Sequence, residues 1–421
     1  MKDEKIKYVK KKSKTIKEKF KEKFKEGKIL PVTVQDLDIT EDDIWENLIN
    51  FDYSELIKLE DKTTGSENYL YKNENQYIKY YPLYLKDYSQ YYNYISFTEH
   101  FGNLDKLMLK VIRKKKGQKD ISPYDGWFTE KTLNYILNNF TSKDLNNILN
   151  KNMSEELKIK MIDLHFNKNI YGSHYVSHFD PMIIPAIFTF LKSENIITKE
   201  FNKLKVLDPS SGWGDRMTSC AILGIKKYYG FDPNWDLIES YYQLKKFLRE
   251  KTKIKFENAT EFITADLPYE ESNFKDDIFD IVITSPPFFN LEVYKNDKTQ
   301  SYIKYNKYGT WFNKWFKNFI IISIRFVKLN GLFIVHVNNV RDMKIHNDMI
   351  KYIKELQNVE ILFTILYERG KNLDPIPITV MKKVGKKKLI LEHTAKKFVP
   401  KQQRLKEEEQ QRLIEEEELE E

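Results

Sequence analysis

The sequence predicts an α/β chain built around a doubly wound, mostly parallel sheet, and three observations support this fold class. Short apolar segments recur between about residues 203 and 384, and stretches with helical periodicity separate most of them. Strands that alternate with helices are typical of parallel sheets with both faces covered. An acidic loop that contains glycines also follows the first apolar segment directly, as expected at the ligand-binding end of such a sheet.

Six apolar segments are expected to be strands, because each is short and bounded by polar or turn-forming residues. Helical patterns such as 235–251 and 311–327 fall between most of them. No helical pattern separates the last two segments, so the final strand is expected to run antiparallel. The six segments are Lys205–Leu207, Tyr228–Phe231, Ile281–Thr284, Leu332–Val337, Glu360–Leu366 and Ile378–Lys382.

Differences in composition divide the chain into four regions. Residues 1–30 form a basic arm with a net charge of +8, expected to be a solvated charged helix or disordered. Residues 31–168 include helical patterns at 129–140 and 154–166 and predict a mainly helical accessory region. The sheet domain is expected over residues 169–385, and residues 386–421 form a charged tail that ends in a Glu-rich stretch.

Composition and charge limit the functional classes. The 421 residues are 41% hydrophobic, which is enough for a sizeable core, and one cysteine excludes a disulfide framework within the chain. The longest apolar run, near 319–324, is far shorter than the roughly 20 residues of a membrane helix. We therefore expect an intracellular, cytoplasmic protein with no membrane partner. The net charge of +8 suits a nucleic-acid partner, although Lys-rich codon usage explains it equally well.

The loop after the first strand reads Asp208-Pro209-Ser210-Ser211-Gly212-Trp213-Gly214. Glycines let the backbone approach a ligand closely, and an acidic residue suits a cofactor with a positively charged end. The dinucleotide pattern G-x-G-x-x-G is absent. Asp232 ends the second strand, 24 residues after Asp208, where a carboxylate commonly accepts ribose hydroxyls. Taken alone, either Asp is more often a turn or cap residue.

These features resemble class I S-adenosylmethionine-dependent methyltransferases. The run 208–214 looks like their motif I, Asp232 like the acidic residue of motif II, and Asp266 falls where motif III contacts the adenine. Phe179 lies in a segment that resembles motif X, where an aromatic side chain covers the methionine end of the cofactor. The resemblance covers about half the chain and implies a Rossmann-like methyltransferase sheet with S-adenosylmethionine as cofactor. Its cofactor-binding residues would be Phe179, Asp208, Ser210, Gly212, Gly214, Asp232 and Asp266.

The third strand runs into Ser285-Pro286-Pro287-Phe288, which resembles motif IV of the amino-methyltransferases. An exocyclic amine is a poor nucleophile because its lone pair is delocalised into the base. The Ser285 hydroxyl and the Pro286 carbonyl would accept its two N–H groups and turn the lone pair toward the methyl group. Pro287 adds backbone rigidity, and Phe288 offers a flat face to a flipped base. These four residues are the predicted catalytic residues, and no metal site is predicted.

The resemblance implies direct methyl transfer to a nucleic-acid base. Cys220 lies in the helix after motif I and is expected in the core, so a covalent thiol mechanism is not predicted. The loop after motif IV (291–302) and the Gly-Trp-Gly-Asp-Arg form of motif I look like those of phage and giant-virus DNA methylase-like proteins.

Three hypotheses about the function stay open. DNA is the expected substrate, with adenine N6 or cytosine N4 as the acceptor, and a Ser at the head of motif IV is commoner in cytosine-N4 enzymes. An RNA base methyltransferase is the second reading, and a catalytically silent nucleic-acid-binding subunit is the third. The charged termini also offer a surface for a protein partner.

Overall fold

The computed structural model describes residues 14–33, 36–38, 40–57, 80–84, 101, 122–166, 179–234, 237–252, 275–291, 300–368 and 375–385. The chain forms two compact units, which are described separately. One comprises Met1–Asp38 and Asn103–Val176, and the other comprises Ile39–Gly102 and Ser177–Glu421. We call them the helical unit and the sheet unit.

The helical unit is held together by a small aromatic and aliphatic core. Phe20 and Phe24 lie four residues apart on α1 and are buried, and the Phe24 ring lies 6.1 Å from that of Trp127. Part of the predicted solvated arm is therefore an amphipathic helix that packs, because two phenylalanines share one helix face. The helices are α1 (Ile16–Lys25), α5 (Pro123–Trp127), α6 (Glu130–Asn139), α7 (Ser142–Leu149) and α8 (Glu155–Phe166).

The sheet unit contains a seven-stranded sheet in the order β1-β6-β7-β5-β4-β2-β3. Strands β2, β3, β4 and β5 pair in parallel, whereas β7 runs antiparallel to both of its neighbours. The antiparallel direction of the last strand is therefore confirmed. The strands are β1 (Tyr80–Tyr84), β2 (Lys205–Asp208), β3 (Lys227–Gly230), β4 (Phe279–Thr284), β5 (Val327–His336), β6 (Val359–Glu368) and β7 (Ile376–Lys383).

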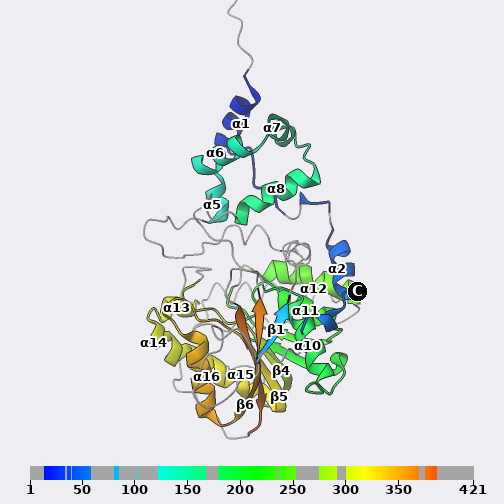
Figure 1. Ribbon diagram of the computed structural model, residues 1–421, viewed down its shortest axis with the longest axis vertical. Helices are drawn as coiled ribbons and strands as arrows, with labels where there is room; N and C mark the ends of the chain where they lie inside the picture. Colours follow the sequence, from blue (N-terminus) through cyan, green and yellow to red (C-terminus); the bar gives the residue numbers. More distant parts are fainter. Residues whose placement is uncertain are drawn as a thin grey trace, which may run out of the picture. The chain divides into compact units, whose positions relative to one another are not determined.

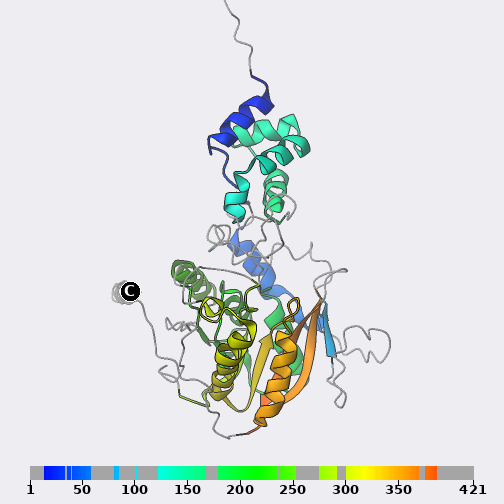
Figure 2. The ribbon, with the colours of Figure 1, turned by 90° about the vertical axis from the view of Figure 1, so that its left-hand side faces the viewer.

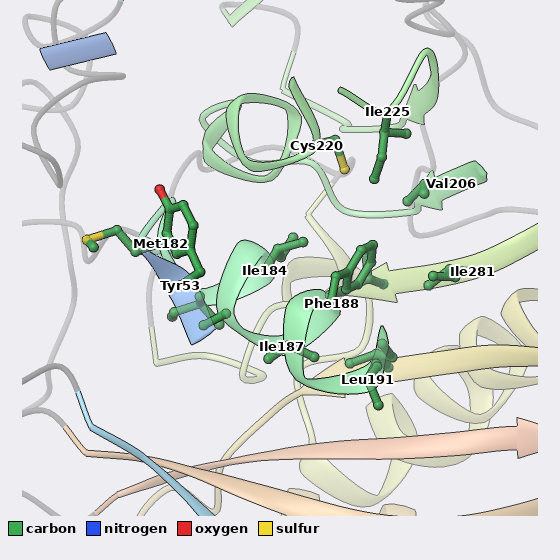
Figure 3. Close-up of a cluster of buried hydrophobic side chains, with 14 of the residues drawn as sticks. Tyr53, Met182, Ile184, Ile187, Phe188, Leu191, Val206, Cys220, Ile225 and Ile281 are labelled. Carbon is green, nitrogen blue, oxygen red and sulfur yellow. The ribbon is translucent and has the colours of Figure 1, made fainter. Parts of the chain in front are cut away.

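Both faces of the sheet are covered by helices, as the predicted doubly wound fold requires. Figure 1 shows α10, α11 and α12 on one side of the strands and α13, α14 and α16 on the other. Neighbouring residues of one strand contribute to different cores: Ile281 packs with the first group of helices and Val282 with the second. In Figure 3 the side chains of α10 face Val206 and Ile281 of the sheet.

Helices of the sheet unit account for most of the remaining described chain. The segment 312–316 is a π-helix that joins α14 to α15. The elements are α2 (Glu41–Asn50), η2 (Tyr53–Glu55), α10 (Ile183–Ser193), η3 (Phe201–Lys203), α11 (Asp215–Ile222), α12 (Ile238–Thr252), α13 (Ser301–Lys304), α14 (Tyr308–Trp311), η6 (Phe312–Phe316), α15 (Lys317–Phe326) and α16 (Ile345–Leu356).

The sheet unit reaches further toward the amino terminus than the expected boundary at residue 169. Trp45 and Leu48 of α2 are buried in the same core as α10, and β1 pairs in parallel with β6 at the edge of the sheet (Figure 2). Residues 39–102 therefore belong with the sheet rather than with the accessory helices. The physical reason is that the apolar face of α2 is covered by the core of the sheet unit.

Candidate active site

The predicted site residues that the structure describes lie at one edge of the sheet, because parallel strands point their carboxyl ends the same way. Asp208 ends β2, Asp232 follows β3, and Ser285 follows β4. His336 ends β5, the next strand along. The structure thus brings motif I, motif II and motif IV to adjacent strand ends.

The glycine loop after β2 has a left-handed backbone at both of its glycines. Gly212 has a φ of 59° and Gly214 a φ of 88°, values that glycine adopts without the steric cost of a side chain. The Gly212 N–H donates to Asp232 Oδ2 at 2.9 Å, and the Tyr241 hydroxyl donates to the Gly212 carbonyl. A Cβ on Gly212 would meet no atom closer than 3.9 Å, so this side of the loop is open to a ligand.

Asp208 lies beneath the loop, and its charge is balanced within the protein. Its Oδ2 accepts from Arg216 Nε at 2.6 Å and from the Tyr228 hydroxyl at 2.8 Å. Its Oδ1 accepts from the Ser210 N–H at 3.2 Å, and the side chain is fully buried. Oδ1 keeps one lone pair, but burial of the whole side chain keeps it from the surface of the loop. In this structure the carboxylate holds the loop and the first turn of α11 together.

The Asp232 carboxylate is the acceptor that the loop leaves available. It lies partly buried after β3, and its two oxygens accept from the N–H groups of Gly212 and Asn234, both at 2.9 Å. Burial raises the pKa of Asp232 to about 7, although the two backbone donors oppose that rise. Each oxygen keeps a second lone pair, so the carboxylate has the chemistry to accept ribose hydroxyls.

The motif IV loop turns its two phenylalanines in different directions. Phe288 is partly exposed and its ring lies 6.0 Å from that of His336, whereas Phe289 is buried against Trp311. Phe289 has a φ of 57°, an uncommon conformation for a non-glycine residue and one that strained functional loops often hold. The buried Phe289 therefore anchors the loop and leaves Phe288 at the sheet edge.

One hydrogen bond joins the glycine loop to the strand end that precedes Ser285. Ser210 Oγ lies 2.5 Å from Thr284 Oγ1, the hydroxyl that directly precedes Ser285. Phe179 packs between Arg216 of α11 and His336 of β5, with the Arg216 guanidinium 4.9 Å from its ring centroid and the His336 ring 5.3 Å away in an edge-to-face contact. Phe179 is 9% exposed. The residue predicted to cover the cofactor thus lies beside the partner of Asp208, which is Arg216, and the partner of Ser285, which is His336.

Two further residues, which were not among the predicted site residues, also lie in this site. Arg216 pairs with Asp208, and His336 Nδ1 lies 2.9 Å from Ser285 Oγ. A signal existed for His336, since it is a polar residue at the end of an otherwise apolar predicted strand. Nothing in the sequence indicated that Arg216 would turn back toward Asp208 rather than face solvent.

Some predictions fall elsewhere. Asp266 lies outside the described residues, as does most of the loop 291–302. Within that loop, Ser301 and Tyr302 are buried, and the Ser301 hydroxyl accepts from Trp311 Nε1. Cys220 is buried in the core of the sheet unit, as expected (Figure 3). No helix in the described ranges has the length and apolar character to cross a membrane.

No family model and no curated protein matches this sequence. Among solved structures, a S-adenosylmethionine-dependent methyltransferase from Methanosarcina mazei is 14% identical, covering 46% of this chain and 97% of its own, with a TM-score of 0.32. Magnesium protoporphyrin IX methyltransferase from Synechocystis is 12% identical (61% and 97% covered, TM-score 0.33). A tRNA methyltransferase from M. jannaschii is 18% identical (47% and 50% covered, TM-score 0.30).

The sheet unit has a Rossmann-like α/β fold, with a mostly parallel sheet that helices cover on both faces. The strand order and the antiparallel β7 of this chain define that fold. The glycine loop and the motif IV segment occupy the carboxyl edge of its sheet.

Proposed function

We propose that this chain transfers the methyl group of S-adenosylmethionine to an exocyclic amino group of a nucleic-acid base, with DNA as the polymer and adenine N6 or cytosine N4 as the acceptor. The observation that carries the proposal is the hydrogen bond between Ser210 of the glycine loop and Thr284 at the head of Ser285-Pro286-Pro287-Phe288. This hydrogen bond joins the glycine loop, which has the chemistry to bind the cofactor, to the segment that has the chemistry to bind an amino group of a base.

The residues of the glycine loop fit the cofactor. S-Adenosylmethionine supplies an electrophilic methyl group on a sulfonium when it is bound. Asp232 accepts the ribose hydroxyls, and the backbone at Gly212 allows close approach. Phe179 covers the methionine end, and Asp208 fixes the loop through Arg216. Asp266 is the proposed contact to the adenine.

Motif IV provides the acceptor side of the reaction. Ser285 Oγ and the Pro286 carbonyl accept the two N–H groups of the amine, which directs its lone pair toward the methyl group. Phe288 stacks against the flipped base, and the buried Phe289 keeps the loop in place. Because the proline rings fix φ and remove N–H donors, Pro286 and Pro287 present acceptors in a rigid frame.

Two variants test the motif IV assignment. We expect Ser285→Ala to lower kcat by about 10²- to 10³-fold, and Phe288→Ala to lower kcat/KM by about tenfold or more through lost stacking. Both should bind S-adenosylhomocysteine as the wild type does. Ser193→Ala, which removes a hydroxyl bonded to the Phe190 carbonyl at the far end of α10, is the matched control and should keep full activity. Wild-type rates in both motif IV variants would overturn the assignment.

A further inference from the structure

His336 is a partly exposed residue at the end of β5, and it contacts three of the residues assigned above. Its Nδ1 lies 2.9 Å from Ser285 Oγ. Its ring lies 5.3 Å from Phe179 at an interplanar angle of 85°, and 6.0 Å from Phe288 at 41°. The register of the sheet explains the position, since Thr284 pairs with Val335 and each is followed by one of the two polar residues.

We propose that His336 is a positioning residue that sets the direction of the Ser285 hydroxyl for the acceptor amine. In this arrangement His336 Nδ1 carries no proton and accepts the Ser285 O–H. The inference rests on the proposed function, which it deepens by explaining how a serine can serve as an acceptor at the head of motif IV.

The chemistry of a hydroxyl gives such a partner a clear function. A serine hydroxyl is both a donor and an acceptor, and its hydrogen rotates to suit its surroundings. An amine with two N–H groups needs acceptors only, so a hydroxyl hydrogen pointing at it would be repelled. An acceptor at Nδ1 removes that hydrogen from the site and leaves the lone pairs of Ser285 facing the amine.

The imidazole ring of His336 packs against two aromatic side chains, which restrict its orientation. Phe179 contacts the ring edge-to-face and Phe288 lies tilted beside it, so two rings limit its rotation. The same two aromatic side chains are those proposed to cover the cofactor and the base. His336 therefore couples the geometry of Ser285 to both ligands.

Two substitutions of His336 distinguish the effect of its acceptor nitrogen from the effect of its aromatic ring. His336→Phe keeps an aromatic ring between Phe179 and Phe288 but has no acceptor. His336→Asn loses the ring but can place a carbonyl oxygen near the position of Nδ1. We expect His336→Phe to lower kcat by about 10- to 100-fold with KM changed less than threefold, and His336→Asn to recover most of kcat. A purely structural role predicts the reverse order.

The double variant Ser285→Ala/His336→Phe tests whether the histidine acts through the serine. Activity is measured as label transferred from S-adenosylmethionine to a single-stranded oligodeoxynucleotide that contains adenine and cytosine. We expect the double variant to be no slower than Ser285→Ala alone, because the hydroxyl that His336 orients is already gone. A rate lowered by the product of the two single effects would overturn the proposal.

A measurement independent of turnover separates this proposal from the proposed function. Nitrogen-15 spectra of the imidazoles, with His336 assigned by the signal lost in His336→Phe, report which ring nitrogen carries the proton. We expect an unprotonated Nδ1 at pH 8. A proton on Nδ1 would overturn the proposal whether or not the chain transfers label, whereas an inactive wild type with an unprotonated Nδ1 would overturn the proposed function alone.

Discussion

At the scale of single residues, the charge state of Asp232 would link folding to the proposed binding of the cofactor. Its pKa is raised to about 7 by burial, from about 3.8 in an unfolded chain. The proton is therefore held more tightly in the folded protein. This contribution to stability is complete below about pH 4 and is lost as the pH rises toward 7. Ribose hydroxyls that donate to the carboxylate favour its ionised form and act in the opposite direction.

We expect the affinity for S-adenosylhomocysteine to rise between pH 6 and pH 8, by up to about tenfold per pH unit below the pKa. The reason is that binding requires ionised Asp232, whose pKa of about 7 lies in this range. Calorimetric titrations at pH 6, 7 and 8 measure the slope. Asp232→Asn should bind more weakly and without the slope, and an unchanged slope in that variant would contradict the ribose role.

Some residues of the candidate site could be predicted from the sequence, and others could not. The motif residues could be assigned because Ser285-Pro286-Pro287-Phe288 and the glycine loop are contiguous patterns at strand ends. Arg216 and His336 act through side chains that meet across elements, so their partners depend on register and rotamer. A sequence pattern carries no information about such a pairing until the strand order is known.

At the scale of elements, the turn from β2 into α11 depends on Gly214. Its φ of 88° lies in the left-handed region, and an added Cβ would lie 2.5 Å from Leu244 Cδ2 of α12. Gly224 also has a left-handed backbone, with a φ of 68°, but an added Cβ there would meet no atom within 4 Å. The two glycines therefore differ in crowding and not in backbone conformation.

We expect Gly214→Ala to lower the free energy of unfolding more than Gly224→Ala does. A left-handed alanine costs roughly 1–2 kcal/mol at either position, and the clash with Leu244 adds about 1–3 kcal/mol at Gly214 alone. Urea unfolding of the two variants measures the difference. Equal losses of unfolding free energy in the two variants would show that Leu244 of α12 moves aside at no cost, and would contradict this prediction.

Six of the seven strands could be predicted because each contains a short apolar run bounded by polar or turn-forming residues, and helical patterns separate all but the last two. Strand β1 could not, since Tyr-Tyr-Pro-Leu-Tyr has Pro82 at its centre. Proline lacks the N–H that a central strand needs and is confined to edges. Among the described strands, β1 lies at the edge of the sheet and pairs with β6.

At the scale of the whole molecule, each unit has its own core. Trp45 is 3% exposed within the core of the sheet unit, and Trp127 is fully buried in the helical unit. The boundary at residue 169 could not be corrected from sequence, because α2 has the same amphipathic pattern as the accessory helices. Only tertiary contacts decide which core covers its apolar face.

We expect Trp45→Ala and Trp127→Ala to destabilise different units, each by about 3–5 kcal/mol. Thermal unfolding with and without S-adenosylhomocysteine distinguishes them, because a ligand stabilises only the unit that binds it. Trp45→Ala should lower the transition that the ligand raises, and Trp127→Ala should leave that transition in place. A loss of the ligand-sensitive transition in Trp127→Ala would contradict the division.

The central claim is methyl transfer to a base amino group, and one measurement tests it most directly. Labelled S-adenosylmethionine is incubated with the full chain and duplex DNA, single-stranded DNA or RNA, and the nucleosides are analysed by mass spectrometry. We predict labelled N6-methyladenine or N4-methylcytosine in DNA. Label confined to RNA would contradict the choice of polymer, and no label in any polymer from a protein that binds S-adenosylhomocysteine would contradict the claim itself.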